Sequence, residues 1–347
     1  MSRNRFLFIL LSTSLGVLLL VSGLYSNTEK VESYFTEKVN GVSLVATSSP
    51  DNNEHFDDIE QISANWVTII PFAFSREGEP QVSFNQEWQW YGEKEEGVIN
   101  SIKKARSLRL KVMLKPHVWI SGQGWPGEYD LKTEAEWKTW EADYEKYILA
   151  YAKLANDHSV DLFCIGTEFR IAAVKRKKFW KMLSGKVRKL FNGRITYAAN
   201  WDNYQNVEFW DDVDFIGVDA YFPLSDSRTP MVDELVSSWA SVKKDLQTAS
   251  SRFKKQILLT EYGYESRDYT AKGHWNIDID TLQVNVEGQK NAYEALYSSL
   301  WKEEWVAGGF LWKWFPSMPQ LPERETKRYT PQHKPVLETI RIWYGDH

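Results

Sequence analysis

The fold is indicated by an apolar run that ends in an acid, Gln256-Ile-Leu-Leu-Thr-Glu-Tyr-Gly-Tyr-Glu-Ser266. Residues 257–259 have the character of a buried strand, and Glu261 stands at its carboxyl end. The segment Asp161-Leu-Phe-Cys-Ile-Gly-Thr-Glu-Phe-Arg170 repeats the pattern, with Glu168 after the apolar run. An ionised carboxylate is costly to bury without partners. Two such acids at the ends of apolar strands therefore indicate a fold in which strand ends form a functional site.

Eight apolar runs of this kind are distributed along the chain. Most of them are too apolar to have a solvated face, which is typical of parallel strands that are buried on both sides. The runs occupy residues 42–46, 66–70, 111–114, 161–165, 194–198, 214–218, 256–259 and 306–311.

The segments between the runs have apolar residues at helical spacing. Helices are predicted around residues 98–105, 137–154, 232–242, 293–300 and 336–343, whereas 203–210 has room only for a turn or two. Strands that alternate with helices eight times predict an α/β fold, a single (β/α)8 TIM barrel over residues 41–347. The competing doubly wound sheet needs fewer strands and usually a glycine-rich turn after the first one, which is absent here.

The N-terminus predicts export. Arg3 and Arg5 precede an uncharged, leucine-rich stretch that ends at Tyr25, so residues 1–25 are expected to be a signal peptide or a signal anchor. Residues 26–40 are expected to be a polar linker. Positive charge before the apolar stretch places the catalytic body outside the cytoplasm, either exported or membrane-anchored, with membrane contact only through this segment.

Composition and motifs exclude several other classes of protein. A net charge of −5 offers no basic face for nucleic acid. The six histidines are scattered, so neither a metal site nor a cofactor is expected. Residues 122–127 match the dinucleotide-binding letters G-x-G-x-x-G, but Pro126 interrupts the helix that this motif must open. We expect a loop here, with Trp125 overhanging the site.

The two glutamates fit the chemistry of a barrel. Catalytic groups of TIM barrels lie at the carboxyl ends of strands, and Glu168 and Glu261 end the fourth and seventh predicted strands. Two carboxyl groups that face one cleft are the minimum needed to cleave a glycosidic bond, one as the acid and the other as nucleophile or base. Tyr221, at the end of the sixth strand, is expected to donate a hydrogen bond to the ionised acid.

Other strand ends carry hydrogen-bonding and aromatic side chains, as a neutral polyhydroxylated ligand requires. Glu168 paired with Arg170, a core His117 and a structural Asp219 are the alternatives to a functional role. The chain contains 17 tryptophans, a load that suits stacking on sugar rings as well as core packing. The predicted substrate-binding residues are Lys115, His117, Trp119, Asn200, Trp201, Asp219, Tyr221 and Trp312.

In their order along the chain, five short segments resemble glycoside hydrolase family 113, the β-mannanase-like enzymes. They are Lys115-Pro-His117, Ile165-Gly-Thr-Glu168, Gly217-Val-Asp-Ala-Tyr221, Leu259-Thr-Glu261-Tyr-Gly263 and Gly309-Phe-Leu-Trp312.

The resemblance implies a retaining hydrolase of β-1,4-mannan or manno-oligosaccharides, with Glu168 as acid/base and Glu261 as nucleophile. It implies a covalent glycosyl-enzyme intermediate, and we expect a monomer. Much of the related clan has Asn before the acid/base, where it contacts the sugar 2-hydroxyl. This chain has Thr167 there, so that contact is expected to differ or to come from Asn200.

Two alternatives remain open from the sequence. One is a glycan-binding barrel without catalysis, and the other is a β-glycosidase of glucan, xylan or galactan. Endo or exo action depends on the loops 121–133 and 265–286, the second of which contains His274 and Trp275.

Overall fold

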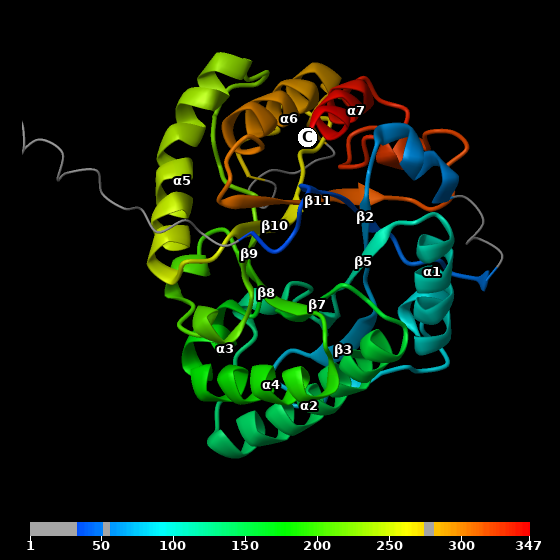
Figure 1. Ribbon diagram of the computed structural model, residues 1–347, viewed down its shortest axis with the longest axis vertical. Helices are drawn as coiled ribbons and strands as arrows, with labels where there is room; N and C mark the ends of the chain where they lie inside the picture. The colour runs from blue at the N-terminus through cyan, green and yellow to red at the C-terminus, as the bar shows by residue number, and fades with distance from the viewer. Residues whose placement is uncertain (1–32, 51–55, 274–280) are drawn as a thin grey trace, which may run out of the picture. The chain divides into compact units, whose positions relative to one another are not determined.

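The structure, a computed structural model, describes residues 33–50, 56–273 and 281–347. Eight parallel strands close into a barrel in the ring order β1-β11-β10-β9-β8-β7-β5-β2 (Figure 1). Each of the eight predicted runs overlaps one of them, so the barrel prediction is confirmed. The barrel strands are β1 (Val39–Leu44), β2 (Trp66–Ile69), β5 (Lys111–Leu114), β7 (Leu162–Thr167), β8 (Arg194–Asn200), β9 (Phe215–Asp219), β10 (Ile257–Tyr262) and β11 (Val306–Trp314).

Helices surround this ring, and the predicted apolar stripes form their buried faces. In α2, Thr133 and Glu136 form a capping box in which each side chain accepts from the other's backbone N–H. The stripe that follows buries Trp137, Trp140 and Tyr144. The helices are α1 (Glu95–Ser107), α2 (Glu134–Asp157), α3 (Arg170–Lys175), α4 (Lys177–Leu190), α5 (Val232–Phe253), α6 (Val286–Leu300) and α7 (Val336–Asp346).

Two of the seven crossovers between barrel strands have 3-10 turns and no α-helix in the part of the chain that the structure describes. The chain between β1 and β2 forms η2 (Phe56–Ile62), and the chain between β8 and β9 forms η5 (Tyr204–Asn206) and η6 (Trp210–Asp212). The second case agrees with the prediction of only a turn or two at 203–210.

The barrel interior has an apolar cluster of its own at the end where the strands begin. Tyr34 and Phe35 pack against it, with ring centroids 5.3 Å from Phe215 and 4.9 Å from Trp66, respectively. The barrel domain therefore starts earlier than residue 41, because β1 begins at Val39 and two rings of the predicted linker seal the bottom of the barrel. The cluster consists of Val39, Trp66, Met113, Leu162, Phe215, Leu258, Ala307 and Phe310.

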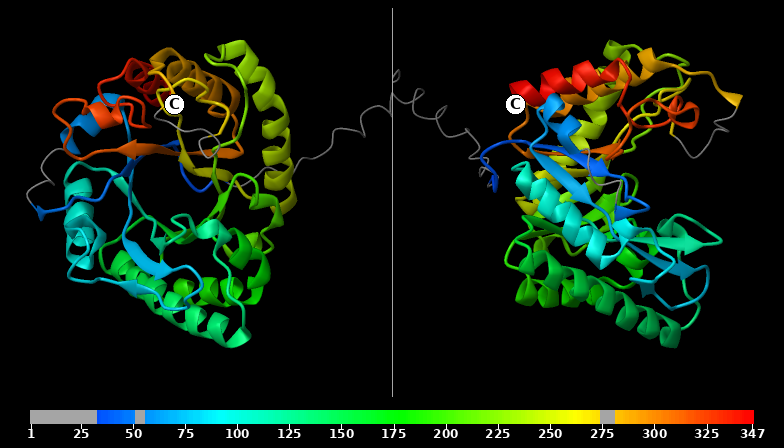
Figure 2. Two further views of the ribbon diagram at one scale, coloured as in Figure 1. Left: turned by 180° about the vertical axis from the view of Figure 1, so that it is seen from behind. Right: turned by 90° about the vertical axis from the view of Figure 1, so that its right-hand side faces the viewer.

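A second, small sheet was not predicted. It has the order β4-β3-β6 and is formed by β3 (Phe72–Arg76), β4 (Ser83–Phe84) and β6 (His117–Ser121). Pro71 separates β3 from β2, and Pro116 separates β6 from β5. A proline cannot donate to the strand ladder, so both barrel strands end before it. The segments that follow the two prolines, β3 and β6, pair with each other in a sheet that extends from the barrel (Figure 2).

Some predictions concern residues outside the described ranges. The predicted signal segment 1–25 and the pair His274-Trp275 belong to this group. In the ranges that the structure does describe, no helix has the length and apolar character required to span a membrane.

The tight packing between strands predicts opposite effects for two glycine substitutions. In Gly217→Ala on β9, the new Cβ lies 2.1 Å from the carbonyl oxygen of Tyr197 on β8, so we expect a loss of about 1–3 kcal/mol of unfolding free energy. In the control Gly185→Ala on α4, the Cβ meets no atom within 4 Å, and the helix gains about 0.5–1 kcal/mol. Urea unfolding followed by tryptophan fluorescence measures both. Equal stability of the two variants would contradict this account.

Candidate active site

Glu168 and Glu261 lie at the carboxyl ends of the fourth and seventh barrel strands, as predicted. Glu168 follows β7 directly, and its backbone N–H donates to Ala198 of β8 at 2.8 Å. Its φ of 54° lies in the left-handed region, which is costly for a residue with a side chain and is found most often at functional sites. The backbone thus turns sharply at the residue that has to face the cleft.

Glu261 owes its position to an irregularity in β10. The register between β10 and β9 shifts between Leu259 and Glu261. As a result the consecutive residues Thr260 and Glu261 reach the same network: Thr260 donates to Asp219 at 2.7 Å, and Glu261 accepts from Lys115 at 2.6 Å. A regular strand would send these two side chains to opposite faces, so the shift re-aims one of them into the barrel mouth.

Lys115 is the centre of this network and is fully buried. Its Nζ lies 2.6 Å from Oε1 of Glu261 and 3.1 Å from Oδ1 of Asp219, and it donates to the carbonyl of Thr260 at 3.4 Å. One cation therefore holds two carboxylates from two different strands. Because Lys115, Asp219 and Glu261 are all buried, they lose contact with water, and these mutual contacts replace the lost hydration of their charged forms.

Glu261 has further contacts on both oxygens. The hydroxyl of Tyr221 donates to Oε2 at 2.8 Å, as predicted, and Nε2 of His117 lies 3.4 Å from Oε1. Donors that face a carboxylate favour its ionised form. Donors thus face both carboxylate oxygens of Glu261.

The other groups of this network have displaced pKa values. Burial, together with the charge of Lys115, holds the pKa of His117 well below its usual range, so this imidazole is neutral. Burial and the neighbouring charge of Glu261 raise the pKa of Asp219 to about 7. Burial opposes the charge of Lys115, but Asp219 and Glu261 outweigh it, and the pKa of Lys115 is raised above its ordinary value.

Glu168 has the contrasting environment. It is half-buried, and burial first, then the charges of Asp219 and Glu261, raise its pKa well above the ordinary value. The indole N–H of Trp125 donates to its Oε2 at 2.7 Å. The alternative in which Glu168 forms a structural salt bridge with Arg170 is not what the structure shows. Arg170 pairs instead with Glu128 and with Asp202. The surroundings of Glu168 therefore favour its protonated form.

The remaining predicted residues lie around the same strand ends. Trp312 lies parallel to His117, with an interplanar angle of 1° and ring centroids 6.1 Å apart. Asn200 pairs with Asp219 in the register of β8 and β9, and its side-chain oxygen accepts from the N–H of Trp201. Trp201 packs edge-on against Phe222 at 5.9 Å.

Two further residues clarify the surroundings of Glu168. The hydroxyl of Thr167 donates to the carbonyl of Pro116 at 3.4 Å. It is therefore bonded to the backbone, whereas the asparagine expected at this position in the related clan contacts the sugar 2-hydroxyl. Trp119 is half-exposed on β6, outside the charged network.

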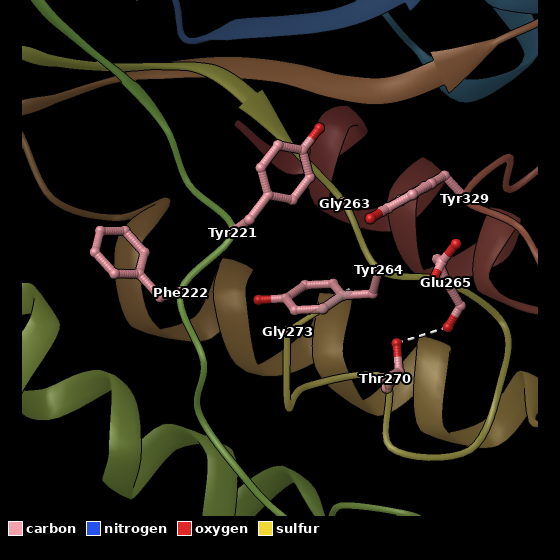
Figure 3. Close-up of a pocket in the computed structure, with 8 residues that line it drawn as sticks. All are labelled: Tyr221, Phe222, Gly263, Tyr264, Glu265, Thr270, Gly273 and Tyr329. Carbon is pink, nitrogen blue, oxygen red and sulfur yellow. Dashed lines mark hydrogen bonds between the residues drawn. The ribbon is translucent and has the colours of Figure 1, made fainter. Parts of the chain in front are cut away.

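A small pocket adjoins this network (Figure 3). Tyr221 belongs to both, because it donates to Glu261 and lines the pocket with Tyr329, whose ring lies 5.9 Å away. Glu265, also in the lining, is held by Arg267. The lining consists of Tyr221, Phe222, Gly263, Tyr264, Glu265, Thr270, Gly273 and Tyr329.

Sequence reasoning missed several of these contacts. Thr260 carried no signal, because nothing in its neighbourhood announces the register shift. The small sheet did carry one: His117, Trp119 and Ser121 alternate with apolar residues directly after a proline, which is the period of a half-buried strand. Within the described residues, no group of three or more His, Cys, Asp or Glu side chains is arranged to hold a metal ion.

These observations define a class. A closed parallel barrel that brings two carboxyl groups with contrasting surroundings to the ends of strands four and seven is the arrangement of a TIM-barrel glycoside hydrolase. Comparison with known proteins then identifies the family: the profile of Glycoside Hydrolase Family 113 matches residues 46–334, and the chain belongs to that family.

Solved structures are similar in fold. A family 113 β-mannanase from Alicyclobacillus acidocaldarius has 22% identity and a TM-score of 0.79 over 91% of this chain and 99% of its own. A second family 113 β-1,4-mannanase has 23% identity and a TM-score of 0.73, over 90% and 100%. A β-glucuronidase from an uncultured Clostridium has 14% identity and a TM-score of 0.61, over 88% of this chain and 50% of its own. No curated protein matches the chain.

The Lys115 network predicts a non-additive loss of stability. Lys115→Met leaves Asp219 and Glu261 buried without their cation, and we expect a loss of about 3–5 kcal/mol of unfolding free energy. Adding Asp219→Asn removes one of the stranded charges and should recover part of this loss. Urea unfolding of wild type, both single variants and the double variant closes the cycle. Additive losses would contradict the coupling.

The Trp125 hydrogen bond predicts a shift of the pH profile. The indole N–H stabilises the ionised form of Glu168, so Trp125→Phe is expected to raise the pKa of this acid further. Activity that needs protonated Glu168 is lost as pH rises through that pKa, so the alkaline limb of kcat/KM should move to higher pH. Trp90→Phe, at an exposed tryptophan, is the control. An unmoved or lowered alkaline limb in Trp125→Phe would count against the assignment.

Proposed function

We propose that this glycoside hydrolase cleaves β-1,4-linked mannan or manno-oligosaccharides with retention of anomeric configuration. The observation that carries the proposal is the contrast between the two acids. Glu261 receives hydrogen bonds from Lys115 and Tyr221, whereas Glu168 is half-buried with a raised pKa. Two carboxyl groups with opposed protonation states are what a double displacement requires.

In the first step, Glu168 gives its proton to the glycosidic oxygen while an oxygen of Glu261 attacks the anomeric carbon. The bond from that carbon to the leaving sugar breaks, and an ester to Glu261 forms. The tyrosine and lysine donors keep Glu261 ionised and hold it in a fixed orientation before the attack. The free alcohol departs with the proton of Glu168.

In the second step, Glu168 changes its role because its surroundings change. Esterification removes the negative charge of Glu261, which is one of the causes of the raised pKa of Glu168. With that repulsion gone, the carboxylate of Glu168 is stable enough to take a proton from water, which attacks the anomeric carbon and releases Glu261. The same acid thereby serves as proton donor and then as base.

The mannan specificity is supported by family membership and by the two similar family 113 structures, which are β-mannanases. The Thr167 hydroxyl is engaged with Pro116, so the sugar 2-hydroxyl, which is axial in mannose, would be recognised by other groups. A panel of mannan, glucomannan, xylan, galactan and β-glucan, assayed for new reducing ends, tests the specificity. The NMR spectrum of the first product formed tests retention, since the initial anomer must keep the configuration of the substrate.

Substitution of either acid predicts distinct losses. Glu168→Gln is expected to lose about 10²–10⁴-fold in kcat on mannan, because it cannot protonate the leaving group. The loss should be smaller on aryl mannosides with activated leaving groups, which depart without a proton. Glu261→Ala should show no turnover on either substrate. Glu208→Gln, at an exposed glutamate paired with Lys177, serves as the control. Near-normal activity of either active-site variant would refute the roles.

We also propose that the catalytic domain acts outside the cytoplasm, on the grounds of Arg3 and Arg5 before the apolar stretch that ends at Tyr25. Cell fractionation with and without residues 1–25 tests this proposal. Retention of the truncated chain in the cytoplasm supports it, and export of that chain would contradict it.

A further inference from the structure

We propose that the outward face of the small sheet β4-β3-β6 is a binding platform for the distal sugar rings of an extended polysaccharide chain whose scissile bond lies at Glu168 and Glu261. This inference rests on the proposed function and specifies the form of the substrate: a polymer bound along a surface, cleaved within the chain. The sheet extends from the barrel on the same side as the loop that follows β10 (Figure 2).

The alternation of the two longer strands produces an aromatic face. β3 buries Ala73 and Ser75, and β6 buries Val118 and Ile120. An open sheet face is normally polar, but here aromatic rings occupy it. The outward residues are Phe72, Phe74, His117 and Trp119, and the register of the two strands aligns the first with the third and the second with the fourth.

The rings form a continuous surface with an exposed outer end. Phe72 lies 5.3 Å from His117, and Phe74 lies 4.7 Å from Trp88. Exposure rises outward, to 50% at Trp119 and 63% at Trp88. Exposed large apolar rings are unfavourable in water, and a group of them marks a site that a ligand or a partner covers.

The inner end of this surface is the catalytic site itself. Nε2 of His117 lies 3.4 Å from Oε1 of Glu261, and the ring of His117 is parallel to that of Trp312. A chain whose reacting sugar sits at Glu261 therefore meets the platform without crossing a gap in the aromatic surface. This continuity favours a linear polymer over an unrelated protein partner as the occupant.

The loop after β6 supports both the platform and the acid. It folds back so that Gly124 bridges to Ile120, and the φ of +83° at Gly124 suits a residue without a side chain. A Cβ on Gly124 would lie 3.5 Å from the ring of Trp119, so this backbone backs the platform ring. The next residue, Trp125, donates to Glu168.

The platform is anchored rigidly from below. The hydroxyl of Tyr147 on α2 is shared between the carbonyls of Pro71 and His117, at 2.9 and 3.1 Å. The ring of Phe84 on β4 packs 5.1 Å from the same tyrosine. Rings held in place before binding lose little conformational entropy when a sugar stacks on them.

The test compares long and short substrates in Trp88→Ala, Trp119→Ala and the double variant. We expect kcat/KM on polymeric mannan to fall about tenfold for each tryptophan removed, as for truncation of an aromatic contact in other interfaces. Activity of Trp88→Ala on an aryl mannoside, which occupies only the catalytic end, should stay within twofold or so of wild type, because Trp88 lies at the exposed outer end of the platform. Met182→Ala, an exposed apolar residue on α4, is the control, and thermal unfolding confirms that the variants fold.

A second measurement separates this inference from the proposed function. In affinity electrophoresis through gels that contain the polysaccharide panel, wild type should be retarded by one polymer and the double variant should not. Retardation without any hydrolysis would refute the function and support the platform. Unchanged hydrolysis of polymer by the double variant would overturn the platform and leave the function intact. A dimer in wild type that becomes monomeric in the double variant, with polymer activity unchanged, would also overturn it, because the face would then cover a second copy of the chain.

Discussion

The structure depends on one buried cation. Lys115 lies at the end of β5 with no exposed surface and neutralises carboxylates from β9 and β10. Replacement of a buried ion pair by apolar residues is often neutral or stabilising in proteins, so stability alone does not account for a lysine at this position. What it provides is a fixed position for Glu261 at the mouth of the barrel, because one cation balances two neighbouring acids whose negative charges would otherwise repel each other.

The same charges give Glu168 and Glu261 contrasting surroundings. Burial first, and then the negative charges of Asp219 and Glu261, raise the pKa of Glu168, and the charge of Lys115 offsets this rise only in part. Trp125 is the local contact that limits the rise in the pKa of Glu168. The two glutamates therefore differ in their surroundings rather than in residue type: Glu168 is desolvated and repelled by negative charge, whereas Glu261 is held by Lys115 and Tyr221.

Much of this architecture follows from sequence, because the eight apolar runs and the acids after the fourth and seventh are local signals that the barrel rule converts into one site. The contacts of Lys115 and Thr260 are not local. They depend on a register shift at the end of β10, and strand register is set by packing across the whole ring. Tyr34 and Phe35 escaped prediction for the same reason, since two rings in a polar stretch seal the barrel only when strands distant in sequence have met.

Pro71 and Pro116 connect the charged site to the aromatic platform. Each proline ends a barrel strand and starts a strand of the small sheet. Lys115 and His117 stand on either side of Pro116, two residues apart, and both approach Oε1 of Glu261, at 2.6 and 3.4 Å. In an extended chain, residues two apart share a face, so one short segment both places a cation on Glu261 and begins the row of rings that leads away from it. A barrel strand that continued without the proline would keep the lysine but lose the sheet, and with it the proposed platform beside Glu168 and Glu261.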